Sequence, residues 1–232
     1  MDKRAKRRDQ RRRRTGKDYR TVDIGNGMEQ AAPEAVFHAM AALPPDLDWT
    51  SLAGSVIPIL PRRRPMPPAT GEPVRVTLPP GIPTGFGIDI GRAFLVVGTS
   101  LLASWQVGTA GLVAAALENL RDRVRPIRPR DLVAELIDGV PVRVLQSGAG
   151  CASTLVLVPD ELSRILGPQP QCLIAPMRDL LISMPGDVDR GFAGWLNDEF
   201  SAMDPNGLAL DAFVLGDGAL RYESFRTGRT AA

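Results

Sequence analysis

Arg178 and Asp179 are the strongest polar pair in this sequence. They follow Pro176 in the segment PMRD, between the apolar runs QCLIA (171–175) and DLLISM (179–184), and this pattern predicts two strands joined by a tight turn. A neighbouring guanidinium lowers the pKa of a carboxyl group, which suits ligand anchoring better than general-base catalysis. The alternative, which we favour, is a structural turn held by a salt bridge or by backbone pairing. Pro176, Arg178 and Asp179 are therefore candidates for a ligand site or a structural turn.

The segment SGAGCAS (147–153) offers Ser147, Cys151 and Ser153 as nucleophiles close to glycines. A serine or cysteine hydrolase also needs a base beside its nucleophile. The sequence holds one histidine, His38, and that residue lies in a predicted core helix. The sequence therefore predicts a turn at 147–153, and we assign no catalytic residue.

Metal and cofactor sites are not indicated either. Cys151 and Cys172 stand apart, without a CxxC pair, so Cys and His cannot supply the usual ligands of zinc. Carboxylates gather on or near one predicted helix, where capping and solvation explain them without a metal: Asp187, Asp189, Asp198 and Glu199. We predict no metal and no cofactor.

Positive charge is concentrated at the N-terminus. The first 20 residues hold eleven Lys or Arg and three Asp, a net charge of +8 within a total of +2, so positions 21–232 carry −6. An acidic domain repels phosphates, and any affinity for RNA or DNA must therefore come from the tail. The candidate contacts are Arg7, Arg8, Arg11, Arg12, Arg13 and Arg14. The alternatives are a solubilising extension, or a start site upstream of the true one at Met28.

The overall composition, with 44% hydrophobic and 23% charged residues, is that of a soluble protein with one substantial core. It excludes a fully disordered chain and a disulfide scaffold. The uncharged run 93–117 is interrupted by glycines and polar residues, so we predict a buried strand followed by core helices and no membrane span. Residues 18–32 lack the apolar stretch of a secretory signal, and we predict a cytoplasmic protein.

The elements that position these residues alternate between strand and helix beyond residue 84. The patterns predict strands at 85–90, 93–97, 142–146 and 171–184, helices at 100–105, 109–124, 159–166 and 187–203, and two closing strands around Gly216–Gly218. Thr99 or Ser100, and Thr109, are predicted helix caps. A further helix is predicted at 33–43, and VRVTL (74–78) is a possible edge strand. The predicted organisation is a disordered tail (1–21), a helical segment (22–57), a Pro-rich connector (58–83), an α+β domain (84–226) and a flexible C-terminus (227–232).

The predicted fold class is α+β, with a mixed or antiparallel sheet and packed helices. The segment PVRV occurs at 73–76 and again at 141–144. Each copy precedes strands and an amphipathic helix, which indicates a possible duplicated strand-helix-strand unit.

Three segments together resemble the YtpQ-like family of uncharacterised bacterial proteins. They are SWQVGTAGLVAAALENLRDR (104–123), STLVLVPDELSRILGPQPQCLIAPMRDLLISM (153–184) and DPNGLALDAFVLGDGALRYE (204–223). The matching features are Trp105, the run Ala116 to Arg121, and the turn with Pro176, Arg178 and Asp179. The resemblance covers roughly 90–224 and implies an α+β domain in the bacterial cytosol, with no reaction attached.

The leading functional prediction is a non-enzymatic interaction or ligand-binding module with protein partners and no membrane contact. The alternative is an accessory protein that residues 1–20 tether to RNA, DNA or ribosomes. A second alternative is an enzyme with a site around Arg178 and Asp179.

Overall fold

The computed structural model describes residues 47–63, 71–90, 94–148, 150–204 and 207–224. The basic tail, Met28, the predicted helix at 33–43 and His38 lie outside these residues.

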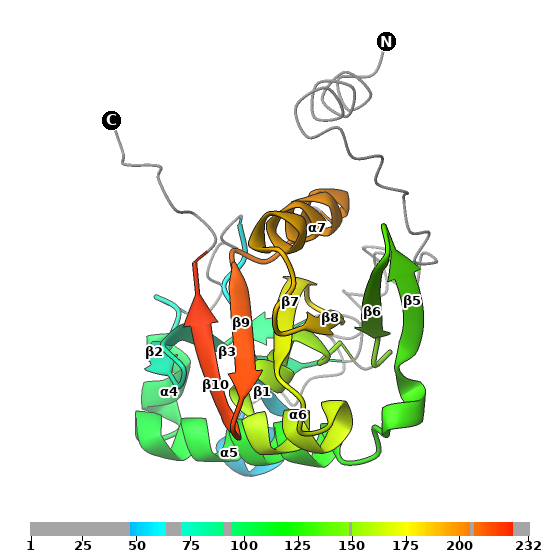
Figure 1. The fold of residues 1–232 in the computed structure, drawn as a ribbon. Coiled ribbons are helices and arrows are strands. Elements are labelled where there is room, and N and C mark those ends of the chain that lie inside the picture. The colour runs from blue at the N-terminus through cyan, green and yellow to red at the C-terminus, as the bar shows by residue number, and fades with distance from the viewer. Residues whose placement is uncertain (1–46, 64–70, 91–93, 149, 205–206, 225–232) are drawn as a thin grey trace, which may run out of the picture.

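A small antiparallel sheet forms the N-terminal part of the described chain (Figure 1). β3 (Ile82–Asp89) is its centre, and it pairs with β1, β2 and β4. The other elements of this part are α3 (Trp49–Leu52), a 3-10 turn (Ala53–Ser55), β1 (Val56–Ile59), β2 (Arg75–Leu78), β4 (Phe94–Val96), α4 (Thr99–Ser104) and α5 (Thr109–Val124).

A six-stranded antiparallel sheet follows, in the order β10-β9-β7-β8-β6-β5. Figure 1 shows β5 at one lateral edge of this sheet and β10 at the other. Its strands are β5 (Val133–Ile137), β6 (Val140–Leu145), β7 (Gln171–Met177), β8 (Leu180–Pro185), β9 (Ala212–Gly216) and β10 (Ala219–Glu223). Its helices are α6 (Pro159–Leu166) and α7 (Arg190–Met203), with 3-10 turns at Pro129–Asp131 and Ser153–Leu157.

The large sheet is covered on both faces, which explains why the central strands are apolar almost throughout. Successive side chains of a strand point to opposite faces. On β7, Cys172 and Ile174 pack with α7, through a cluster that includes Phe192 and Leu196. Leu173 and other residues of the opposite face pack with the turn 153–157, with α6 and with the C-terminal half of α5. The Arg178–Asp179 turn is therefore carried by two strands that burial constrains from both sides.

The α+β prediction is confirmed, and so is the tight hairpin at 171–184, which forms β7 and β8. The described part of the uncharged run, 94–117, contains β4, α4 and the N-terminal half of α5, so a strand followed by helices is found there as predicted. Within the part of the chain that the structure describes, every helix is too short or too polar to cross a bilayer. The two PVRV segments lie in unlike positions, because β2 pairs with the next strand in sequence, whereas β6 pairs with β5 and β8.

Regular structure extends further toward the N-terminus than the sequence predicted. The range 58–83, predicted as a Pro-rich connector with a possible edge strand at 74–78, contains part of β1 and the start of β3, and β2 forms the predicted edge strand. Pro58 is compatible with β1 because that strand lies at the edge of its sheet, where a missing N–H breaks no second ladder. The helix caps also differ: the N-cap residues are Gly98 and Gly108, one position before the predicted threonines.

Asn119 connects α5 to the start of the small sheet. Its side-chain amide donates to the carbonyl oxygens of Ala53 (2.6 Å) and Val56 (2.9 Å). We expect Asn119→Ala to lower the free energy of unfolding by about 1–2 kcal/mol, because two hydrogen bonds from the Asn119 amide are lost, although the Ala53 carbonyl keeps the backbone N–H of Val56 as a donor. Denaturant unfolding measures this loss, and Glu118→Ala, an exposed change on the same helix, is the control. Equal midpoints for the two variants would contradict the role of this amide.

Candidate functional site

Asp179 is buried, and its carboxylate binds the loop that follows β6. It accepts hydrogen bonds from the backbone amides of Ser147 (3.2 Å), Gly148 (2.7 Å) and Ala152 (3.1 Å) and from the Ser147 hydroxyl. A carboxylate has about four favourable acceptor positions, so these donors occupy it. The geometry is that of a structural lock between the hairpin turn and the loop 147–152.

Arg178 points to other partners and makes no ion pair with Asp179 among the salt bridges of the described residues. Its guanidinium carbon lies 3.3 Å from the centre of the Phe94 ring on β4, and Nε donates to the carbonyl oxygen of Gly150 at 3.1 Å. Burial lowers the pKa of Arg178 to about 10, which leaves it charged at neutral pH. Arg178 therefore joins the hairpin of the large sheet to the small sheet.

The space beside this turn is small. Arg178, Phe94 and Arg62 border a crevice of about 10 Å³, room for one water molecule at most. Pro176 accepts a backbone hydrogen bond from Leu208 at 2.9 Å. The three residues that the sequence singled out thus lie together, and the crevice that Arg178 borders within the described residues is too small for a ligand.

The loop 147–152 places its possible nucleophiles in packed surroundings. Burial raises the pKa of the Cys151 thiol, and burial raises the pKa of Cys172 to about 11. Both thiols are therefore protonated at neutral pH, which disfavours nucleophilic attack. The Ser153 hydroxyl donates to the Arg178 carbonyl oxygen at 2.6 Å and so supports the same turn.

The acidic residues of the α7 region have separate roles. Asp189 is the N-cap of α7 and accepts from the Phe192 amide at 2.8 Å. Asp198 pairs with Arg63 at 3.2 Å. Across the described ranges, no three His, Cys, Asp or Glu side chains lie close enough to hold a metal ion.

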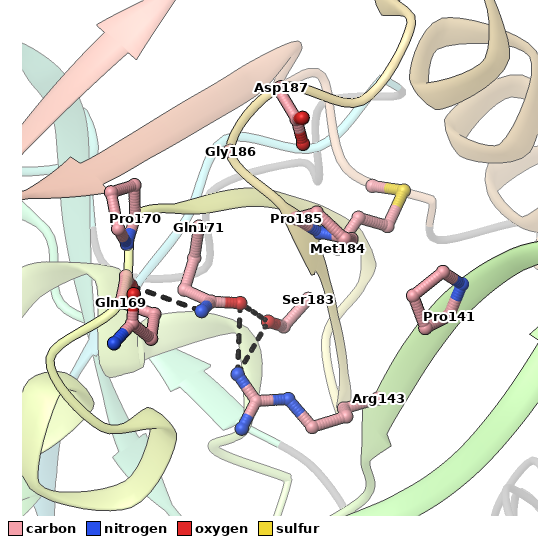
Figure 2. Close-up of a pocket in the computed structure, with 10 residues that line it drawn as sticks. All are labelled: Pro141, Arg143, Gln169, Pro170, Gln171, Ser183, Met184, Pro185, Gly186 and Asp187. Atoms are coloured by element: carbon pink, nitrogen blue, oxygen red, sulfur yellow. Dashed lines mark hydrogen bonds between the residues drawn. The ribbon is translucent and has the colours of Figure 1, made fainter.

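A larger cavity, of about 490 Å³, lies where β6 separates from β8 (Figure 2). The two strands pair from Arg143–Ser183 to Leu145–Leu181, whereas Val140–Val142 pair with β5. The separation leaves the start of β6 and the end of β8 facing a common space. The lining residues are Pro141, Arg143, Gln169, Pro170, Gln171, Ser183, Met184, Pro185, Gly186 and Asp187.

A polar cluster occupies one end of this cavity. Arg143 donates to the Leu166 carbonyl oxygen and to the Gln171 side-chain oxygen, each at 2.9 Å, and lies 3.5 Å from the Ser183 hydroxyl. Ser183 in turn donates to the Gln171 side-chain oxygen at 2.7 Å. Figure 2 shows the Arg143 guanidinium directed at this pair, with Asp187 at the opposite end. Gln171 and Ser183 are buried, and Asp187 is exposed at the rim.

The Arg143 guanidinium has neutral partners only, within the described residues. The three contacts above are made by Nη1 and Nη2, and no hydrogen bond of Nε is found within the described residues. A half-buried positive charge without a carboxylate, in a cavity of this size, is an arrangement that attracts an anionic group.

Comparison with family models, with curated proteins and with solved structures found no significant match for this chain.

Arg143, Gln171 and Ser183 were not predicted as site residues from the sequence. Their signal is present as a polar residue inside each of three otherwise apolar segments: Arg143 in VPVRVL, Gln171 in QCLIA and Ser183 in LLISM. Polar residues at strand positions with buried neighbours require partners, which makes them candidates for a shared site.

Proposed function

We propose that this chain is a non-enzymatic ligand-binding module. The cavity between β6 and β8 binds a small molecule through an oxyanion group, which is either a carboxylate or a phosphate. The observation that carries the proposal is the Arg143 guanidinium, which lines a cavity of about 490 Å³ and has only neutral partners among the described residues. Planar guanidinium donors match the two oxygens of a carboxylate or phosphate.

The rest of the cavity complements a compact ligand. Pro141, Pro170 and Pro185 supply rigid apolar walls, and these residues lose little conformational entropy when a ligand binds. Gln171 and Ser183 hold the guanidinium in place, which lowers the cost of ordering it on binding. The carboxylate of Asp187 at the rim favours a ligand whose far end is neutral or positively charged.

The test measures binding of benzoate, citrate and inorganic phosphate to the full chain by calorimetry and by thermal shift. We expect at least one probe to bind and to stabilise the fold by about 2.7 kcal/mol at a hundredfold excess over its Kd. Arg143→Met should lower that affinity by at least about tenfold, a loss of about 1.4 kcal/mol. Arg221→Met, at an exposed position of β10, is the matched control. Absence of binding by all three probes, or equal affinity of the Arg143 variant, would refute the proposal.

A second candidate function is tethering to RNA, DNA or ribosomes. The observation that favours it is the net charge of +8 on residues 1–20, against −6 on the rest of the chain. The tail and the cavity involve different residues, so the two functions are compatible.

A cytoplasmic location and a relationship to the YtpQ-like family are part of the same proposal. The cysteines Cys151 and Cys172 are unpaired and buried, which fits the reducing cytoplasm. The three segments that resemble the YtpQ-like family support kinship with that family, and protein partners are proposed on the basis of the non-enzymatic prediction.

A further inference from the structure

The cavity between β6 and β8 carries one charged side chain of each sign. Arg143 and Asp187 are the charged residues of its lining, and Figure 2 shows them at opposite ends of the space. Within the described residues no salt bridge joins the two, and Asp187 forms none with any other cation. The cavity therefore offers a positive group at one end and a negative group at the other.

The turn that carries Asp187 is held against the cavity wall. On one side of Asp187, the Gly186 amide donates to the Pro170 carbonyl oxygen at 3.0 Å. On the other side, the Val188 amide donates to the Pro185 carbonyl oxygen at 3.1 Å. A Cβ at Gly186 would approach Pro170 to 2.8 Å, so the turn lies directly on this proline. The backbone of Asp187 therefore has a defined position relative to the cavity.

Arg190 is a cation of the same segment, but its guanidinium has other partners. It donates to the carbonyl oxygens of Gly186 at 3.2 Å and Val188 at 3.4 Å. It also lies 3.4 Å from the carboxylate of Glu223 on β10. The Asp187 carboxylate is thus left to a cationic group of a ligand, because Arg190 does not contact it.

We propose that the ligand of this cavity is a zwitterion, with its anionic group on Arg143 and an amine or guanidinium group at Asp187. This inference rests on the proposed function, because it assigns the second end of a ligand whose first end binds Arg143. Asp187 lies four positions beyond Ser183, a neighbour of Arg143, and this span is at most about 13 Å along an extended chain. The ligand is therefore a short molecule with its charges at opposite ends, such as an ω-amino acid.

Complementarity of charge favours a zwitterion over a simple ion. A simple anion on Arg143 leaves the Asp187 carboxylate without a partner, and a simple cation at Asp187 leaves the Arg143 guanidinium without one. A zwitterion satisfies both groups through charge-assisted hydrogen bonds. It also binds in one orientation, because the reverse orientation places like charges together at both ends.

The test measures binding of two matched pairs of acids to the full chain by calorimetry at about 50 mM salt. One pair is 6-aminohexanoate and 6-hydroxyhexanoate, and the other is 8-aminooctanoate and 8-hydroxyoctanoate. Each pair shares its length and its carboxylate, and differs in an ammonium or a hydroxyl group at the far end. We expect at least one amino acid to bind about two- to fivefold more tightly than its hydroxy acid, the range of an exposed ion pair. Higher salt should reduce this preference.

Variants of the two charged residues separate their roles. Asp187→Asn should abolish the preference for the amino acid and leave the affinity for the hydroxy acid within about twofold, because a neutral amide replaces the carboxylate. Asp187→Lys should reverse the preference. Arg143→Met should weaken both members of a pair by at least about tenfold. Glu118→Gln, which removes an exposed carboxylate of α5, is the matched control and should change neither affinity.

The outcomes distinguish this inference from the proposed function. Equal binding of both members of each pair, or a preference that persists in Asp187→Asn, would refute the zwitterion, while weakening by Arg143→Met would still support the anion site. Binding of benzoate, citrate or phosphate without binding of these four acids would also refute the zwitterion and leave the anion site standing. If none of these compounds binds, the proposed function fails together with the inference.

Discussion

Asp179→Ala should lower the free energy of unfolding by about 3 kcal/mol. The substitution removes the acceptor of three backbone amides and one hydroxyl on the loop 147–152. The Ala152 amide would lose its partner in a buried position and the two Ser147 donors in a half-buried one, and each such loss costs about 1–3 kcal/mol, partly recovered by water entering the loop. Denaturant unfolding followed by circular dichroism measures the change.

Two comparison variants make this prediction specific. Asp187→Ala removes an exposed carboxylate beyond the opposite end of β8 and should change stability by no more than about 0.5 kcal/mol. Asp179→Asn keeps one acceptor oxygen, so its loss should lie between those of the other two variants. If Asp179→Ala were as stable as the unmodified chain, Asp179 would not be a structural lock. The alternative of an enzyme site around Arg178 and Asp179 would then gain support.

The basic tail should give the largest change in binding. We expect the full chain to bind labelled RNA and duplex DNA, with an affinity that falls by about three orders of magnitude between roughly 50 and 200 mM salt. The expected cause is release of counterions from phosphates neutralised by the arginines of residues 7–14. Fluorescence anisotropy measures both the affinity and its salt dependence.

The control for the tail is a chain of residues 28–232, which carries the acidic part of the sequence without residues 1–20. It should bind neither nucleic acid. A full chain in which Arg11, Arg12, Arg13 and Arg14 are replaced by Gln should show a shallower salt dependence. Binding by 28–232 that equals binding by the full chain would exclude the tail as the contact.

Helices and strands with a clear pattern of apolar residues could be predicted from the sequence. α5 has the predicted bounds, because Leu112, Ala116, Leu120 and Val124 recur every four residues and all are buried. The β7–β8 hairpin was predicted because its strands are buried on both faces and therefore read as apolar runs.

The missed strands lack that signal for physical reasons. β5 was not predicted because only Ile137 faces a core, so no alternation of apolar and polar residues marks it. β1 was missed because Pro58 usually indicates irregular structure.

The sequence predicted where the candidate turn lies but not which partners its side chains bind. Pro176, Arg178 and Asp179 do lie at one turn, and both the Asp179 carboxylate and the Arg178 guanidinium bind the loop 147–152, whereas the guanidinium also lies over Phe94 of the small sheet. The cavity that Arg143 lines exists because β6 pairs with β8 only from Arg143 to Leu145 and separates from it before that point. The pairing register depends on both strands, so residues 140–145 alone do not predict the cavity.

The strand order of the large sheet also governs how the chain must assemble. β7 and β8 are joined by a tight turn, so they can pair after closing a very short loop. β6 is adjacent to β8 and not to β7. The β6–β8 ladder therefore forms only after Leu145 and Leu181, the two ends of a long intervening segment, have come together. The β7–β8 hairpin is thus the fast local event, and docking of β6 and β9 on its two sides is the slower, entropically costly step of folding.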